Sequence, residues 1–109
     1  MIAPDVLVTE TANAIWKRCA LSRGISADEA LRALVDLQRI LPELVPSAAL
    51  VEQALALALR FRHAVYDCLY VALALRDGST LVTYDAALVR SMGPATGRVM
   101  HVDAISLAN

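Results

Sequence analysis

Asp67 is the residue whose position most strongly suggests chemistry. It is the only charged residue between Ala64 and Leu75, in a stretch that is too apolar on all sides to form a surface helix. An ionised carboxylate that is buried without a partner costs several kcal/mol, so something must compensate Asp67. Three explanations are open: a first-turn position facing the helix dipole, an ion pair with Arg60 or Arg62, or a bound metal ion.

Two further acidic residues occupy positions where a ligand could bind. Asp85 ends the β-branched segment 80–84 and precedes an expected helix, which places it at the carboxyl edge of a parallel sheet. The alternative role for Asp85 is an ordinary helix N-cap. Glu10 lies in the expected first helix with Asn13 and Lys17 on the same face, and the alternative there is a solvated polar stripe.

Together these three carboxylates predict a site for a hard divalent cation. Mg²⁺ is held by a few carboxylate oxygens and water, and it needs no His or Cys ligand. The spacing of His63 and His101 predicts no zinc site, and Cys19 and Cys68 lie in apolar helical stretches as packing residues. The sequence contains no Gly-x-Ser-x-Gly nucleophile motif and no glycine-rich phosphate loop, so the residues favour metal chemistry.

The elements that must position these acids alternate between helices and short β-branched runs. We expect helices over residues 5–21, from the Ser26–Glu29 capping box to 41, from Ser47 to 60, over 65–75 and over 86–92, an extended segment at 43–46, and strands at 80–84 and 99–102 separated by a turn at 93–97. Strands separated by helices predict right-handed parallel crossovers and an α/β fold, with few strands for so many helices. We expect Trp16, Tyr66 and Tyr70 in the core.

The size and charge of the chain exclude several classes of protein. Its 109 residues suffice for one domain with one core, and ten basic against eleven acidic residues leave a net charge of -1. The molecule as a whole therefore does not attract nucleic acid or lipid, and a polyanion must be held locally. No apolar stretch is long enough to span a membrane, and two cysteines make no disulfide framework, so we expect a cytoplasmic protein.

Three segments, in their order along the chain, resemble motifs of the PIN domain family, specifically of VapC-type toxin nucleases from toxin–antitoxin pairs. Residues 3–15 are similar to the family's Pro-containing helix start with a Glu-x-x-Asn motif. Residues 65–74 are similar to its most recognisable acidic helix, and residues 81–85 to its strand-end Thr-x-Asp motif. The resemblance spans nearly the whole chain.

The resemblance implies a metal-dependent endoribonuclease that cleaves RNA with metal-activated water. Glu10, Asp67 and Asp85 would be three members of an acidic quartet that binds Mg²⁺ or Mn²⁺, with Asn13 and Thr83 as supporting polar neighbours. The implied partners are an RNA substrate, a cognate antitoxin and a second copy of the chain in a homodimer, with no membrane.

The fourth acid of the quartet has no counterpart here. Family members begin with a hydrophobic strand that ends in an acid, followed by helices, whereas residues 1–4 are similar to the tail of the family's second strand. We therefore expect a single PIN-like domain over residues 1–109, with a three-layer parallel sheet flanked by helices and lacking its first, central strand and its first helices. Loss of one carboxylate should weaken metal binding. Two alternatives are a non-catalytic remnant that dimerises or binds an antitoxin, and a small helical interaction module whose acids only cap helices.

Overall fold

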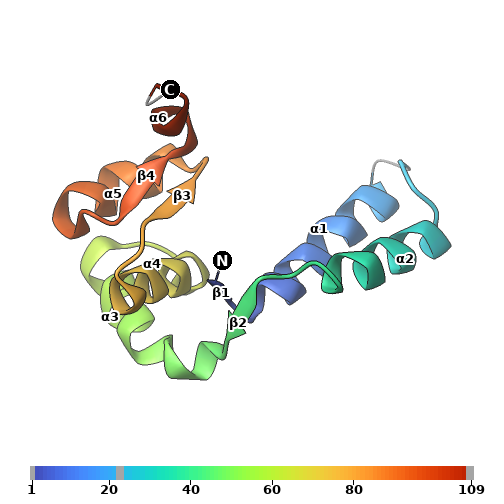
Figure 1. Ribbon diagram of the computed structural model, residues 1–109, viewed down its shortest axis with the longest axis horizontal. Coiled ribbons are helices and arrows are strands. Elements are labelled where there is room, and N and C mark those ends of the chain that lie inside the picture. Colours follow the sequence, from blue (N-terminus) through green and yellow to red (C-terminus); the bar gives the residue numbers. More distant parts are fainter. Residues whose placement is uncertain (1, 22–23, 108–109) are drawn as a thin grey trace. The chain divides into compact units, whose positions relative to one another are not determined.

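The computed structural model describes residues 2–21 and 24–107, and the chain divides into two compact units, Met1–Pro46 and Ser47–Asn109. Figure 1 labels the helices and strands along the chain. Each unit contains two parallel strands together with helices. In the part of the chain that the structure describes, no helix combines the length and the apolar character needed to cross a membrane.

In the first unit, two helices lie along the chain between two short strands, which pair with each other. It consists of β1 (Ile2–Pro4), α1 (Val6–Leu21), α2 (Ala27–Gln38) and β2 (Glu43–Val45). The strands pair in parallel with Ile2 opposite Glu43, and the Asp5 N–H donates to the Val45 carbonyl at 2.8 Å just beyond β1. α1 and α2 lie side by side (Figure 1). The predicted capping box, formed by Ser26 and its partner three residues later, starts α2.

The second unit contains the remaining helices and the other strand pair. It consists of a 3₁₀ turn η1 (Ser47–Ala49), α3 (Val51–Phe61), α4 (Val65–Asp77), β3 (Leu81–Thr83), α5 (Ala86–Thr96), β4 (Val99–His101) and α6 (Val102–Leu107). β3 and β4 pair in parallel with Leu81 opposite Val99. α3 packs along α4, and α5 packs against both strands. The short α6 was not predicted.

α4 is the most buried helix of the second unit. Its buried residues are Cys68, Leu69, Val71, Ala72, Leu73 and Ala74. Leu50, just before α3, and Met92 on α5 are almost completely buried as well. Removing such side chains from water is the main favourable contribution to folding. The prediction of a buried helix over residues 65–75 is therefore confirmed, and this helix carries Asp67 in its first turn.

α5 is longer than the sequence predicts. A turn was expected at 93–97, but the helix continues through Pro94 to Thr96. A proline at this place removes one backbone hydrogen bond and crowds the carbonyl four residues earlier, yet the helix continues, and the Thr96 hydroxyl donates to the Met92 carbonyl at 2.7 Å. The helix ends only at Gly97, where φ is 66°. The expected turn was therefore wrong for four of its five residues.

Two of the aromatic residues expected in the core are exposed instead. Trp16 on α1 is 57% exposed and Tyr66 on α4 is 64% exposed, whereas Tyr70 is partly buried. Tyr66 and Tyr70 are separated by one turn, but the buried face of α4 lies on other residues. Aromatic type and helical spacing therefore did not determine which side chains are covered.

The expected α/β class is confirmed, because helices alternate with parallel strands in both units. Within residues 2–21 and 24–107, the strands form two separate two-stranded sheets. The absence of a central strand and the organisation of residues 1–109 as one domain stay predictions.

Besides α5, which ends at Gly97, two helices of the second unit end at a residue in the left-handed conformation. Arg62 follows α3 with φ of 54°, and Gly78 follows α4 with φ of 71°. Their N–H groups donate to the carbonyls of Ala58 and Ala74, respectively. This conformation costs a residue that carries a Cβ about 1–2 kcal/mol, so the backbone is strained at Arg62 but not at Gly78.

Substitutions at these two positions should change stability in opposite directions. A Cβ at position 78 would meet no atom within 4 Å, so Gly78→Ala adds only backbone strain and should lower the free energy of unfolding by about 1 kcal/mol. Arg62→Gly should raise it by up to about 1 kcal/mol. Urea unfolding followed by circular dichroism measures both values. Arg62→Ala keeps the Cβ and is the control; the same effect in Arg62→Gly and Arg62→Ala would contradict the strain.

Candidate metal site

The second unit brings Asp67 and Asp85 together around a histidine. The Nε2 atom of His63 lies 3.1 Å from Oδ2 of Asp67 and 3.7 Å from Oδ2 of Asp85. One ligand atom from each of the three residues lies within 4.8 Å of the others. Two carboxylate oxygens and an imidazole nitrogen at these distances form a donor set that can hold one divalent cation.

His63 is positioned by the end of α3. The left-handed Arg62 reverses the chain, and the His63 N–H then donates to the Ala58 carbonyl at 3.2 Å. The His63 carbonyl accepts a weak hydrogen bond from the Cys68 thiol on α4, at 4.0 Å. The imidazole side chain is only 15% exposed, so its freedom to turn away from Asp67 is restricted.

Asp67 lies in the first turn of α4, where the helix dipole favours a negative charge. One of the three explanations given by the sequence is therefore met. Its partner is His63, rather than Arg60 or Arg62, and the guanidinium of Arg60 instead lies 4.8 Å from the centre of the Phe61 ring. The Asp67 side chain is 42% exposed, so a hydrated ion has access to it.

Asp85 uses its two carboxylate oxygens for different purposes. Oδ1 accepts from the N–H groups of Ala87 and Leu88, at 3.0 and 3.1 Å, and so caps α5. Oδ2 faces His63. The Thr83 hydroxyl accepts from the Asp85 N–H at 3.0 Å, which fixes the backbone of the strand end. The N-cap that the sequence offered as the alternative role is thus present, and it leaves one oxygen available for a ligand.

Cys68 is next to Asp67 but is not a donor of the site. Burial, and then the nearby charge of Asp67, raise the pKa of the Cys68 thiol. Metals bind the thiolate rather than the thiol, so a raised pKa disfavours Cys68 as a ligand or nucleophile. The residue is buried in the core, in agreement with its predicted packing role.

Glu10 and Asn13 lie on α1, in the first unit, and Thr83, Asp67 and Asp85 lie in the second. Glu10 is partly buried, and Asn13 is exposed. The structure thus brings together two of the three predicted acids, while the approach of Glu10 to them stays a prediction.

His63 is the site residue that the sequence analysis missed. The histidines and cysteines have no zinc-type spacing, but Asp67 follows His63 by four residues. α4 begins at Val65, so His63 and Asp67 do not lie on one continuous helix. Their side chains are nevertheless in contact. A search for carboxylates four residues after each histidine would have found the pair.

Comparison with known proteins identifies the class of fold. The family model of the PIN domain matches residues 1–91, which include all three segments that carry the resemblance. The chain therefore belongs to the PIN domain family, as predicted. It is 40% identical over 87 residues to a protein of Pyrobaculum aerophilum named Ribonuclease VapC3. The match covers 77% of this chain and 65% of that protein, so the chain spans just under two thirds of its relative's length.

Two substitutions of Asp85 separate its capping role from its charge. Asp85→Ala removes both hydrogen bonds to the start of α5 and should lower the free energy of unfolding by about 1 kcal/mol. Asp85→Asn keeps an oxygen acceptor for the cap, and Asn is as good an N-cap as Asp. This variant should therefore lower the free energy of unfolding by only about a few tenths of a kcal/mol. Chemical denaturation without added metal measures both. Equal losses would show that the carboxylate charge, not the cap, stabilises this helix.

Proposed function

We propose that this chain acts as a metal-dependent endoribonuclease of the VapC toxin type. The observation that carries the proposal is the placement of Asp67 and Asp85 oxygens within one small cluster in a member of the PIN domain family. The name of the similar protein, Ribonuclease VapC3, supports RNA as the substrate. Because this chain spans 65% of that relative, the activity, the substrate and the partners are all part of the proposal.

The donor set suits Mg²⁺ or Mn²⁺. Such ions are held in nuclease sites by one or two carboxylates and keep several waters. Asp67 and Asp85 would supply the carboxylate oxygens, and the exposed parts of their side chains, 42% and 44%, leave room for water and phosphate. Glu10, brought by α1, would be a further acidic ligand.

A bound cation would lower the pKa of a water molecule and neutralise negative charge on the phosphate. The chain's own residues hold the carboxylates ready for this task. Thr83 fixes the backbone of Asp85, and the cap on α5 fixes its carboxylate plane. The buried helix α4 holds Asp67. Such preorganisation avoids the cost of arranging the ligands during the reaction.

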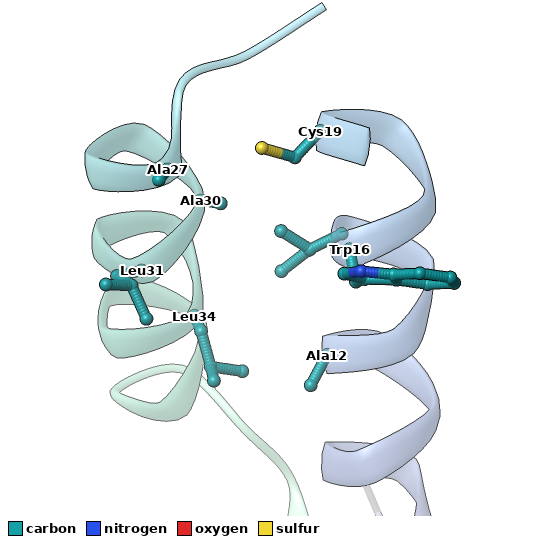
Figure 2. A pocket seen from close by; sticks show the side chains of 8 residues that line it. Ala12, Trp16, Cys19, Ala27, Ala30, Leu31 and Leu34 are labelled. Atoms are coloured by element: carbon teal, nitrogen blue, oxygen red, sulfur yellow. The ribbon is translucent and has the colours of Figure 1, made fainter. Parts of the chain in front are cut away.

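A second role, binding of the antitoxin, is supported by an apolar pocket in the first unit. The pocket has a volume of about 350 Å³ and lies between α1 and α2. Figure 2 shows Cys19 and Leu34 pointing from the two helices into the space between them. Its lining includes Ala12, Trp16, Cys19, Ala27, Leu31 and Leu34. An apolar groove between two helices fits the apolar face of a partner helix, and the antitoxin implied by the VapC resemblance is the partner that we propose.

This second role does not depend on catalysis. A non-catalytic PIN remnant would keep the pocket and bind the antitoxin without cleaving RNA. A homodimer and a cytoplasmic location are further parts of the proposal; the free thiols of Cys19 and Cys68 agree with a reducing compartment.

Removing either aspartate should weaken metal binding. Asp67→Asn and Asp85→Asn should each lower the affinity for Mn²⁺ by about tenfold or more. Mutating a residue that only hydrogen-bonds to a metal ligand already has an effect of this size. The electron paramagnetic resonance signal of free Mn²⁺ measures binding to the full chain. Asp77→Asn makes the same change at the exposed far end of α4 and should bind as the wild type does.

The same variants distinguish the two roles in an RNA cleavage assay. The wild-type chain should cleave single-stranded RNA with Mn²⁺ present, and Asp67→Asn should not. Mn²⁺ binding without cleavage by the wild type would favour the non-catalytic remnant. Unchanged Mn²⁺ binding in both Asp67→Asn and Asp85→Asn would contradict the metal site.

Filling the pocket should weaken antitoxin binding. Ala30 lines the pocket, so Ala30→Trp should lower the affinity for a peptide of the proposed cognate antitoxin by about tenfold, or about 1.4 kcal/mol. Ala33→Trp places the same ring on an exposed position of α2 outside the lining and is the matched control. Fluorescence anisotropy of the labelled peptide measures both. Equal affinities of the two variants would place the antitoxin elsewhere.

A further inference from the structure

We propose that His63 is a further protein ligand of the metal, beside the acidic ones, and makes this site prefer a transition-metal dication over Mg²⁺. This inference rests on the proposed function, because it assumes that Asp67 and Asp85 hold a cation. It goes beyond an acidic site, since a set made only of carboxylates supplies oxygen donors alone. The imidazole of His63 adds a nitrogen donor at the same point.

The distances around His63 are those of ligands that share one ion. With metal–ligand bonds of about 2.1 Å, two ligands of an octahedral ion lie about 3 Å apart when adjacent and about 4 Å apart when opposite. The Nε2 atom of His63 is 3.1 Å from the Asp67 oxygen and 3.7 Å from the Asp85 oxygen. The three ligand atoms lie within 4.8 Å of one another, so the side chains would draw together slightly around one cation, which would replace the hydrogen bond between His63 and Asp67.

The backbone around His63 holds the imidazole in this place. The strained left-handed Arg62 precedes it, and its own N–H is bonded to the end of α3. Its side chain is 15% exposed, against 42% and 44% for the two aspartates. The imidazole is thus the buried donor of the cluster, while the two carboxylates are accessible to solvent. Sparsely populated backbone conformations of this kind occur where the surrounding structure enforces them, often at functional sites.

A nitrogen donor changes which metal is preferred. Mg²⁺ favours oxygen ligands, whereas imidazole suits Co²⁺, Ni²⁺ and Zn²⁺, whose affinity for such sites follows the Irving–Williams order. Replacing an oxygen donor by Nε2 of His63 should therefore raise the affinity for these ions relative to Mg²⁺. The two carboxylates still bind Mg²⁺, so His63 acts on selectivity more than on the ability to bind.

The test compares Co²⁺ and Mg²⁺ binding to the full chain by isothermal titration calorimetry. His63→Gln should weaken Co²⁺ binding by about tenfold or more and Mg²⁺ binding by less than about threefold. His63→Asp keeps a third ligand but supplies oxygen, so it should lose the Co²⁺ preference while keeping Mg²⁺ binding. His101→Gln is the matched control, because His101 also faces an aspartate, Asp103, at 3.5 Å but lies outside the cluster.

A direct measurement covers the case in which the variants fold poorly. In ¹⁵N NMR spectra of the wild-type chain, Zn²⁺ should shift the Nε2 resonance of His63 and not that of His101. Equal weakening of both metals in His63→Gln, or an unshifted Nε2 resonance, would overturn the role of His63 as a ligand. If instead Asp67→Asn binds both metals as the wild type does, the metal site of the proposed function is itself wrong.

Discussion

The candidate site requires two negative carboxylates to approach one point, although like charges repel each other. The structure meets this requirement through the backbone. Asp67 is fixed by α4, which has more buried residues than any other helix of its unit, and Asp85 is fixed by the cap that its own Oδ1 makes with α5. The backbone of Asp67 cannot shift without disturbing the buried helix, and the Asp85 carboxylate cannot shift without loss of its cap. A cation, or the imidazole of His63, is then the natural partner for both oxygens.

Structural and functional roles coincide at these residues. The N-cap of α5 and the first-turn acid of α4 are ordinary stabilising features, and each would suffice to explain an aspartate at its position. Asp85 shows why they do not exclude a metal, because the cap uses Oδ1 and leaves Oδ2 toward His63. An explanation by helix capping alone accounts for neither the convergence of the two aspartates nor the covered imidazole between them.

The first unit contributes differently. Neither α1 nor α2 has a buried residue, and the pocket between them is lined by apolar side chains. α1 carries Glu10 as well as Ala12 and Trp16 from the pocket lining. A partner seated in this pocket would therefore contact the helix that also bears a proposed catalytic acid. Binding and catalysis would then both involve α1.

The sequence by itself determined the family, the α/β class and most of the elements. The capping box at Ser26 and the buried helix over residues 65–75 follow from local hydrogen bonding and from apolar pattern, which depend on near neighbours along the chain. The helix through Pro94 was missed, because a proline inside a helix costs about 3 kcal/mol and local pattern therefore predicts a break there.

The spacing in the sequence could have paired His63 with Asp67, but only the tertiary structure showed that His63 also meets Asp85. That contact depends on the left-handed turn at Arg62 and on the packing of α3 along α4, and neither is written in the spacing of acidic residues. The sequence also did not show which side chains are exposed. Trp16 and Tyr66 are aromatic residues of the kind found in cores, but both are more than half exposed. Which groups meet in space depends on how separate elements pack, whereas local pattern reports on each element alone.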